Sequence, residues 1–362
     1  MGHRHAAAVL PRRRLRRERR LRRGHRRSRW TQGVAAEVTT PREQVFRAIE
    51  RTGPDYVPIY LFNKDEDQSD VVAIGVQHHF MGPKADVSEW GFRWQRLDET
   101  MGQPDAPVLG SSEDVDSLQV PELRPDWRFA DVPAFVERYA DSYRLGALGL
   151  SGFTTMSCLR AFDGLMEDMA LCPDAVEALA DAVFGFEEEI IAAMAGRGLD
   201  AVAFGDDWGT QQGLIISPSS WRRIFKPRYA AQFALAHQHG MHVYFHCCGK
   251  IDPIIPDMIE IGVDLLNLSQ PNLYDIPELG RRYGGRVCFV CPVSYQTTSI
   301  LGTPKEIYED VRALVEHLGG FNGGLVGYVE EYHTIGMSDA NYAACVEAFR
   351  SLGRYNRSAA QD

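Results

Sequence analysis

Short apolar runs separated by longer amphipathic stretches dominate the chain after about residue 140. Six of these runs have the length and the flanking turn residues of buried strands: residues 147–150, 201–204, 242–245, 265–268, 287–290 and 325–329. The stretches between them predict helices, several of which begin with proline, at residues 173–194, 218–239, 253–261 and 304–318. Strands that alternate with helices in this way are typical of a parallel sheet with crossover connections.

The region before residue 140 supplies the remaining elements. Thr40 is a natural N-cap, Pro41 suits a first helical turn, and Glu43 lies three residues after the cap, so a helix is predicted to begin there. Residues 56–61 follow as a seventh short buried strand. Residues 65–140 show weak periodicity, and we expect long loops and surface helices there, with the eighth strand hidden among them. The order predicts a single-domain α/β fold, a (β/α)8 TIM barrel.

Length and composition agree with one barrel. The chain has 362 residues, and α/β barrels commonly exceed 250 residues as one unit. Hydrophobic residues make up 44% and charged residues 24%, and no run of about 18 apolar residues is present to span a bilayer. Seven cysteines form no dense disulfide framework, and the adjacent Cys247 and Cys248 are unsuited to a routine bridge. We therefore expect reduced thiols in a cytoplasmic protein.

The first 30 residues differ from the rest of the chain. They contain 13 arginines and one acid, Glu18, with almost no apolar periodicity and no apolar segment of the kind that follows the basic start of a secretory signal. We interpret residues 1–30 as a disordered Arg-rich tail; the alternative is an arm that touches nucleic acid or a membrane. Because the total charge is −10, the remaining residues carry about −22, and they would repel nucleic acid and acidic membrane surfaces.

Polar side chains collect just past the predicted strands, where the catalytic face of such a barrel lies. They are Asp206, Asp207, His246, Cys248, Asn267, Gln270, Cys291, Ser294, Gln296, Glu330, Glu331 and His333. Substrate contacts are expected from Gln211, Asn267, Gln270 and Gln296. No Gly-x-Gly-x-x-Gly follows a strand and no Walker loop is present, so dinucleotide and nucleoside triphosphate chemistry have no sequence support.

His246 and Cys248 are the strongest candidates for metal ligands. They are two residues apart, so an extended chain projects them to the same side while Cys247 projects oppositely, and Gly249 permits a sharp turn beside them. Thiolate and imidazole together favour zinc, and three protein ligands with one open position are typical of a catalytic site. The alternative is that His246 caps a helix or satisfies a backbone group and that both cysteines pack as small hydrophobic residues.

Two pairs of acids lie at other strand ends. Asp206 and Asp207 are predicted catalytic residues, since one carboxylate can face the barrel mouth while the other caps a neighbouring segment, and paired acids can serve as base, metal ligand or substrate anchor. The alternative is that both only cap loops. Glu330 and Glu331 offer either a third zinc ligand or a solvated rim charge. Cys291 is a weaker candidate, because a cysteine near the end of a buried strand often only packs.

Several longer motifs carry a resemblance to a known family. They are Phe204-Gly205-Asp206-Asp207-Trp208-Gly209-Thr210-Gln211, Ile216-Ser217-Pro218 with Trp221-Arg222 and Lys226-Pro227, Phe245-His246-Cys247-Cys248-Gly249 followed by Ile255-Pro256-Asp257 and Gly262-Val263-Asp264, and Leu301-Gly302-Thr303-Pro304. Together they resemble the uroporphyrinogen decarboxylase superfamily, which includes uroporphyrinogen decarboxylase and the zinc-dependent methylcobamide:thiol methyltransferases. The similarity runs from about residue 40 to 352 and implies a TIM barrel over that span.

The sequence departs from the decarboxylase branch near the first strand. That branch carries an Arg-Gln-Ala-Gly-Arg signature that grips the carboxylates of the porphyrinogen, whereas residues 59–65 here read Ile-Tyr-Leu-Phe-Asn-Lys-Asp. A single lysine cannot replace the bidentate contacts of guanidinium groups. The resemblance therefore favours the methyltransferase branch.

The methyltransferase branch carries a His-x-Cys-Gly motif, which His246, Cys248 and Gly249 match. It also has a distant third ligand, usually cysteine, after the last strand. This sequence has no cysteine at that place, and the resemblance puts Glu331 nearest to it. Glu331 is therefore the expected third zinc ligand, with Cys291 the next candidate.

The resemblance implies a zinc-dependent methyltransferase. A methyl group would pass between a methylcobamide carried by a partner corrinoid protein and a small thiol or hydroxyl acceptor, because zinc lowers the proton affinity of a bound thiol or hydroxyl. One alternative is the decarboxylation of a porphyrinogen in porphyrin biosynthesis, with Asp206 or Asp207 stabilising a protonated pyrrole. A third class is a catalytically silent barrel that only binds a metal or another ligand.

Overall fold

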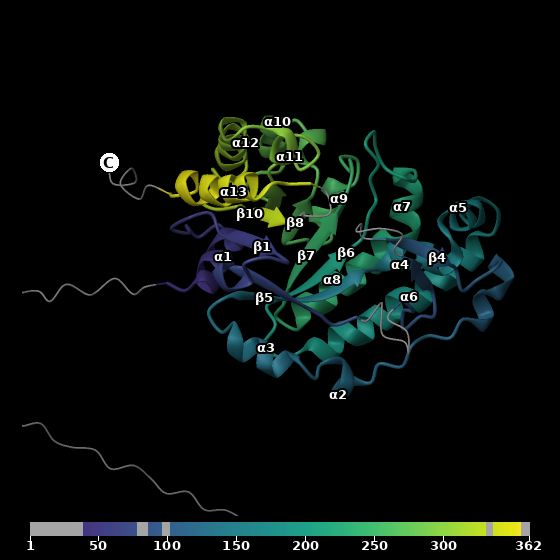
Figure 1. Cartoon of the computed structure of the whole chain (residues 1–362). Helices are drawn as coiled ribbons and strands as arrows, with labels where there is room; N and C mark the ends of the chain where they lie inside the picture. The colour runs from purple at the N-terminus through teal and green to yellow at the C-terminus, as the bar shows by residue number, and fades with distance from the viewer. Residues whose placement is uncertain (1–38, 78–85, 96–101, 331–335, 356–362) are drawn as a thin grey trace, which may run out of the picture. The chain divides into compact units, whose positions relative to one another are not determined.

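Eight parallel strands close into a barrel in the computed structural model, which describes residues 39–77, 86–95, 102–330 and 336–355 (Figure 1). The barrel strands are β1 (Ile59–Phe62), β2 (Val71–Gly75), β5 (Tyr143–Leu150), β6 (Ala201–Gly205), β7 (His242–Cys247), β8 (Leu265–Leu268), β9 (Cys288–Pro292) and β10 (Leu325–Glu330). They follow one another around the barrel as β1-β10-β9-β8-β7-β6-β5-β2, and β2 pairs with β1 to close it. The predicted α/β barrel is confirmed.

The missing eighth strand, β2, does lie in the weakly periodic region. Its residues pair in register with the first half of β5, so that Val71 lies opposite Tyr143 and Gly75 opposite Ala147. The same region also contains a small antiparallel hairpin of β3 (Arg93–Gln95) and β4 (Gln103–Ala106), which does not belong to the barrel.

Helices surround the barrel (Figure 1). They are α1 (Pro41–Glu50), α2 (Pro125–Arg128), α3 (Val132–Arg138), α4 (Gly152–Arg160), α5 (Phe162–Leu171), α6 (Pro173–Met194), α7 (Pro218–Ile224), α8 (Lys226–Gln238), α9 (Ile255–Glu260), α10 (Ile276–Tyr283), α11 (Thr298–Leu301), α12 (Pro304–His317) and α13 (Asp339–Leu352). The capping box predicted at Thr40 is present. The single helix predicted at 218–239 is divided into α7 and α8, because Pro227 has no N–H to continue the helical hydrogen bonds.

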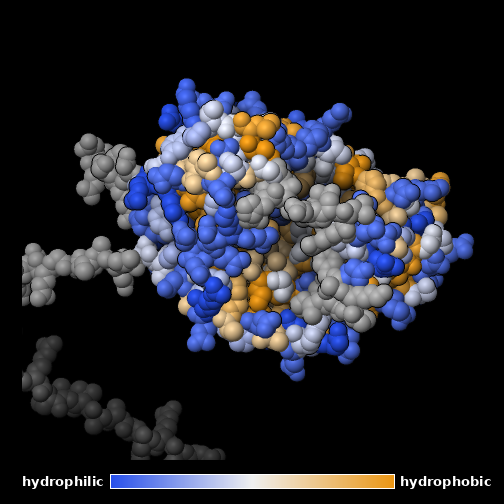
Figure 2. All heavy atoms as spheres, viewed as in Figure 1, coloured by the Kyte–Doolittle hydropathy of each residue, from blue (hydrophilic) through white to orange (hydrophobic). Residues whose placement is uncertain are grey.

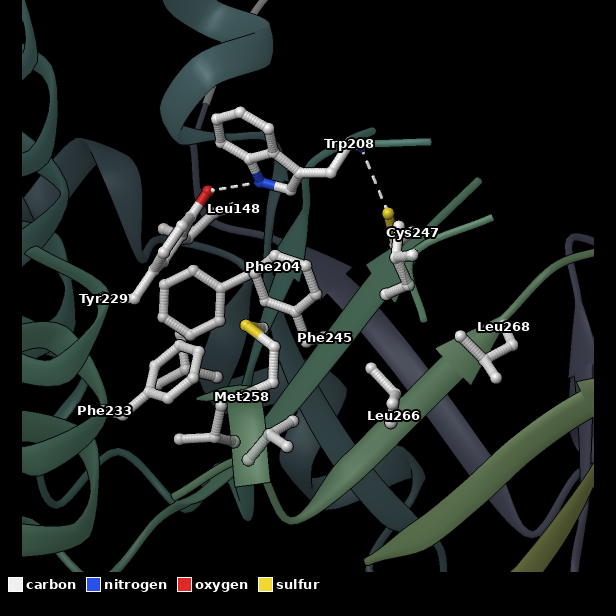
Figure 3. Close-up of a cluster of buried hydrophobic side chains, with 14 of the residues drawn as sticks. Leu148, Phe204, Trp208, Tyr229, Phe233, Phe245, Cys247, Met258, Leu266 and Leu268 are labelled. Atoms are coloured by element: carbon white, nitrogen blue, oxygen red, sulfur yellow. Dashed lines mark hydrogen bonds between the residues drawn. The ribbon is translucent and has the colours of Figure 1, made fainter. Parts of the chain in front are cut away.

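Alternate residues of each strand face the barrel interior, and the others face the helices. On β7, Tyr244 belongs to the buried interior cluster, whereas Val243, Phe245 and Cys247 belong to the larger cluster between strands and helices. Figure 3 shows part of this outer cluster, in which Phe245 and Cys247 lie among aromatic side chains from neighbouring elements.

Helix α1 covers the amino-terminal ends of the strands. Phe46 packs edge-on against Tyr143, the first residue of β5, at a centroid distance of 5.2 Å. Arg42 forms an ion pair of 2.6 Å with Asp200, which directly precedes β6. Since this end of the barrel is covered, side chains at the carboxyl ends of the strands remain available for binding and chemistry.

Hydrophilic residues cover much of the surface in the view of Figure 2, and apolar residues form smaller patches between them. No helix among the described residues combines the length and the apolar character needed to cross a membrane.

Candidate metal centre

The side chains of Asp207, His246 and Cys248 converge at the carboxyl ends of β6 and β7. Their ligand atoms, a carboxylate oxygen, an imidazole nitrogen and a sulfur, all lie within 4.8 Å of one another. His246 Nε2 is 3.7 Å from Asp207 Oδ1 and 3.7 Å from Cys248 Sγ. Strand register explains the convergence. Gly205 lies opposite His246, so Asp207 and Cys248, each two residues further on, project from the same side of the barrel wall.

The loops that carry these donors are in close backbone contact. A Cβ atom on Gly249, whose φ is +75°, would lie 2.1 Å from the backbone of Gly209, and a Cβ on Gly209 would lie 2.5 Å from the backbone of Gly249. Only glycine at both places allows this approach. The amide of Cys248 donates to Asp207 Oδ1 at 2.7 Å, which joins the loop after β6 directly to the end of β7.

Hydrogen bonds determine which nitrogen of His246 faces the other donors. The Nδ2 of Asn267 donates to the carbonyl of Val290 at 2.8 Å, so its Oδ1 faces His246 Nδ1 at 2.6 Å. An amide oxygen only accepts, and Nδ1 must therefore carry the proton. The lone pair of Nε2 is left toward Asp207 and Cys248, which is the arrangement that a metal-binding histidine needs.

Cys248 lies in an acidic environment. Burial and the neighbouring Asp207 carboxylate raise the pKa of the Cys248 thiol to about 12, and Glu330 acts in the same direction. The Tyr295 hydroxyl hydrogen-bonds the thiol and opposes this shift. Because two carboxylates and a thiol gather here, the centre attracts cations, and a bound cation would favour the thiolate.

Asp206 lies on the other side of the wall, between the strands and the helices. It is 0% exposed, and burial raises its pKa to about 7. Its carboxylate accepts hydrogen bonds from the amides of Phe153 and Thr154, from the Thr154 hydroxyl and from the Tyr229 hydroxyl. Asp206 therefore caps α4, a segment that precedes it in the chain, and Asp207 is the member of the pair at the mouth.

The donor set fits a zinc ion. Tetrahedral zinc with bonds of about 2.0–2.3 Å separates its ligand atoms by roughly 3.3–3.8 Å. The two separations of 3.7 Å around His246 Nε2 fall in this range. Cysteine, histidine and aspartate are all zinc ligands, and three of them leave one coordination position open. Among the residues that the structure describes, this is the one such group of three.

The sequence model of the family described as uroporphyrinogen decarboxylase (URO-D) matches residues 96–348, which is more than half of the chain. The chain belongs to the uroporphyrinogen decarboxylase family. A comparison of the sequence with curated proteins finds no match.

A solved methyltransferase structure shows the same architecture. A methyltransferase from Methanosarcina mazei superposes with a TM-score of 0.69 at 16% identity and covers 87% of this chain and 99% of its own. A D-psicose 3-epimerase has a TM-score of 0.41 at 12% identity over 67% of this chain and 86% of its own. An L-ribulose 3-epimerase has a TM-score of 0.41 at 15% identity over 62% of this chain and 79% of its own.

The four residues that the sequence predicted as substrate contacts differ in burial and in their partners. Asn267 is fully buried and contacts His246, while Gln270 accepts a hydrogen bond of 2.7 Å from the Gly249 amide and so supports the turn after Cys248. Gln296 is exposed and accepts from a neighbouring asparagine, and Gln211 is exposed in the loop after β6. The structure thus brings two of the four next to the candidate metal donors.

Two other residues were candidate ligands. Cys291 is fully buried in the outer cluster, so its thiol packs between strands and helices. Glu331 lies outside the described residues. Its neighbour Glu330 ends β10 in the register of Tyr328, an interior residue, and affects the Cys248 thiol electrostatically.

Sequence patterns did not single out Ser269, Tyr295 or Thr154. The hydroxyl of Ser269 lies 3.2 Å from His246 Nδ1, and that of Tyr295 contacts the Cys248 thiol. For Ser269 a signal existed, because it lies two residues after Asn267 and shares its side of the strand. Thr154 belongs to α4, which the sequence did not predict.

Proposed function

We propose that this chain is a zinc-dependent methyltransferase that moves a methyl group between a methylcobamide, presented by a partner corrinoid protein, and a small thiol or hydroxyl acceptor. One observation carries the proposal: carboxylate, imidazole and thiol converge within 4.8 Å at the catalytic end of the barrel. The superfamily that the sequence resembles includes such methyltransferases, and the chain's membership of the family supports the proposal. The fold likeness to a methyltransferase is consistent with it.

Asp207, His246 and Cys248 would hold the zinc. When bound, the metal supplies Lewis acidity, which favours the anionic and nucleophilic form of a thiol or hydroxyl acceptor at neutral pH. Asn267 keeps the imidazole in the tautomer that offers Nε2. The side chain of Asp207 is 49% exposed and that of His246 31% exposed, so an acceptor can approach these donors from the mouth.

Aromatic side chains fill the interior below the donors. Tyr60 packs edge-on against Tyr244 at 6.3 Å and against Tyr328 at 5.4 Å, and all three are buried. A corrinoid is therefore expected to meet the acceptor at the mouth. The acceptor's lone pair would form the new bond to the methyl carbon while the cobalt–carbon bond breaks and leaves its electron pair on cobalt.

Metal analysis and methyl transfer test the proposal together. The purified protein should contain about one zinc per chain under reducing conditions, and Cys248→Ser should lose the metal while keeping the fold, since catalytic zinc rarely holds a barrel together. With free methylcobalamin and a panel of thiols and phenols, the wild type should show the spectral change of demethylation and Cys248→Ser should not. Absence of stoichiometric metal in the wild type, or full retention of it by Cys248→Ser, would overturn the proposal.

Decarboxylation of a porphyrinogen is the second candidate, because the matching family model is named for that enzyme. Residues 59–65 contain no arginine to bind the substrate carboxylates, and the buried Asp206 offers no exposed atom to a pyrrole. Uroporphyrinogen is therefore expected to be a poor substrate. Efficient formation of coproporphyrinogen would favour this candidate. Absence of turnover in both assays would favour the third class, a catalytically silent barrel.

A further inference from the structure

Buried carboxylates bind the first turn of α4. Its N-cap residue, Ser151, makes no capping hydrogen bond with its side chain. Instead the amide of Gly152 donates to Glu187 Oε1 at 2.8 Å, and the amides of Phe153 and Thr154 donate to the two oxygens of Asp206 at 2.9 and 2.8 Å. A helix N-terminus favours negative charge. These contacts place the first turn of α4 firmly against the end of β6.

Gly152 makes this contact possible. Its φ is +47°, and a Cβ atom there would lie 2.5 Å from Asp206 Oδ2 and 2.9 Å from the Tyr229 hydroxyl. A side chain at this position would therefore push α4 away from the carboxylate. Phe153 and Thr154, the next residues of the helix, reach Asp206 only because Gly152 has no side chain.

The hydroxyl of Thr154 joins this buried arrangement to the metal centre. It donates to Asp206 Oδ1 at 2.7 Å and accepts from the backbone amide of Asp207 at 3.2 Å. The backbone amide of Asp207 can only donate, so the hydroxyl accepts from it and directs its own hydrogen to Asp206. The hydroxyl thus bridges the side chain of one residue and the amide of the next.

We propose that Thr154 is a positioning residue for the metal centre. Its hydroxyl fixes the peptide between Asp206 and Asp207, and the Cys248 amide then holds the Asp207 carboxylate beside His246. A hydroxyl that served α4 alone would need only the contact with Asp206. The second contact links the helix to a residue whose carboxylate is one of the three metal donors, so this inference rests on the proposed zinc site.

Three variants of the full-length chain separate positioning from general stability. Thr154→Val keeps the shape and the amide but removes both hydroxyl contacts, whereas Thr154→Ser keeps them. Thr155→Val is the matched control, because it removes a hydroxyl one residue further on, which donates only to the carbonyl of Leu150 at 3.0 Å. Thermal unfolding of all three reports any loss of stability.

Zinc affinity, measured by competition with a chelator, is the first measurement. Thr154→Val should weaken zinc binding about 10- to 100-fold, the usual effect of removing a group that orients a metal ligand. Thr154→Ser and Thr155→Val should stay within about twofold of the wild type. Equal affinity of Thr154→Val and the wild type, or an equal loss in Thr155→Val, would overturn the proposal.

Crystal structures of the metal-free wild type and Thr154→Val provide the second measurement, which does not depend on the proposed function. The wild type should keep Asp207 Oδ1 at hydrogen-bond distance from the Cys248 amide, and in the variant this hydrogen bond should be broken. An intact hydrogen bond in the variant overturns the positioning role even if the wild type binds no zinc. Failure of the wild type to bind zinc, together with a broken hydrogen bond in the variant, contradicts only the proposed function.

Discussion

The carboxylates of Asp206 and Asp207, which are consecutive in the chain, lie on opposite sides of the barrel wall. Asp206 is 0% exposed and accepts four hydrogen bonds, three of them from α4. The side chain of Asp207 is 49% exposed and accepts a bond from the Cys248 amide. Because neighbouring residues of a strand project to opposite sides, Asp206 stabilises the fold while Asp207 can bind a metal.

The same substitution should therefore have different effects at the two positions. Asp207→Asn should weaken zinc binding at least tenfold with little change in stability, because an amide oxygen is a poorer zinc ligand than a carboxylate. Asp206→Asn should lower the free energy of unfolding by about 1–3 kcal/mol, because an amide nitrogen would face buried N–H groups. Chelator competition and urea unfolding measure the two effects, and a reversed pattern would contradict the assignment.

Glutamine variants can separate the roles of Glu330 and Glu331, of which only Glu330 lies among the described residues. Glu330 continues the interior register of Tyr328 and lies near the Cys248 thiol, so Glu330→Gln should weaken zinc binding about tenfold. Glu331→Gln is the matched comparison, because the sequence predicts Glu331 as the third zinc ligand. If only Glu331→Gln weakens binding, then Glu331 is the ligand that the sequence predicted. Equal affinity in the wild type and both variants would leave neither acid a role at the metal.

Glu187 should make stability depend on pH. Burial raises its pKa to about 8, whereas an unfolded glutamate titrates near 4.3. Between these values the native state binds the proton more strongly, so stability falls as pH rises from about 4.3 to 8. In Glu187→Gln this decline should be shallower. Urea unfolding at pH 5, 6.5 and 8 measures it, and parallel declines in the two proteins would contradict a buried, titrating Glu187.

Removal of residues 1–30 should leave the barrel unaffected. An Arg-rich segment without apolar periodicity buries no core and would meet the acidic remainder only through screened surface contacts. Melting temperature, zinc content and turnover of the shortened chain should equal those of the full chain. A clear loss in any of them would assign these residues a role in the folded protein.

The barrel could be predicted from the sequence because its helices and strands have clear periodicity. The long helix α6 has the predicted bounds, residues 173–194. The eighth strand could be placed only within a region, because Val71–Gly75 is short and lies between segments with weak patterns. Helices α4 and α5 were not predicted, since α4 is capped by carboxylates from distant parts of the chain and not by its own N-cap residue.

The candidate site could be predicted in part, because the regular alternation of a strand shows which of its residues share a side. The spacing of His246 and Cys248 shows that they share one side of a strand, and the structure places them together. The sequence could not show which of Asp206 and Asp207 joins them, because that depends on where the pleat of β6 places its last residues. Nor could it show that Asn267 orients the imidazole, since this contact joins neighbouring strands.

The close approach of Gly209 and Gly249 has a consequence for protein engineering. Each backbone occupies the space that a side chain on the other would need. A replacement for the loop after β6 must therefore bring a glycine of its own to that crossing, or the loop after β7 must be replaced with it. The two loops form one transplantable unit, and a scaffold that receives only one of them will not hold Asp207 beside His246.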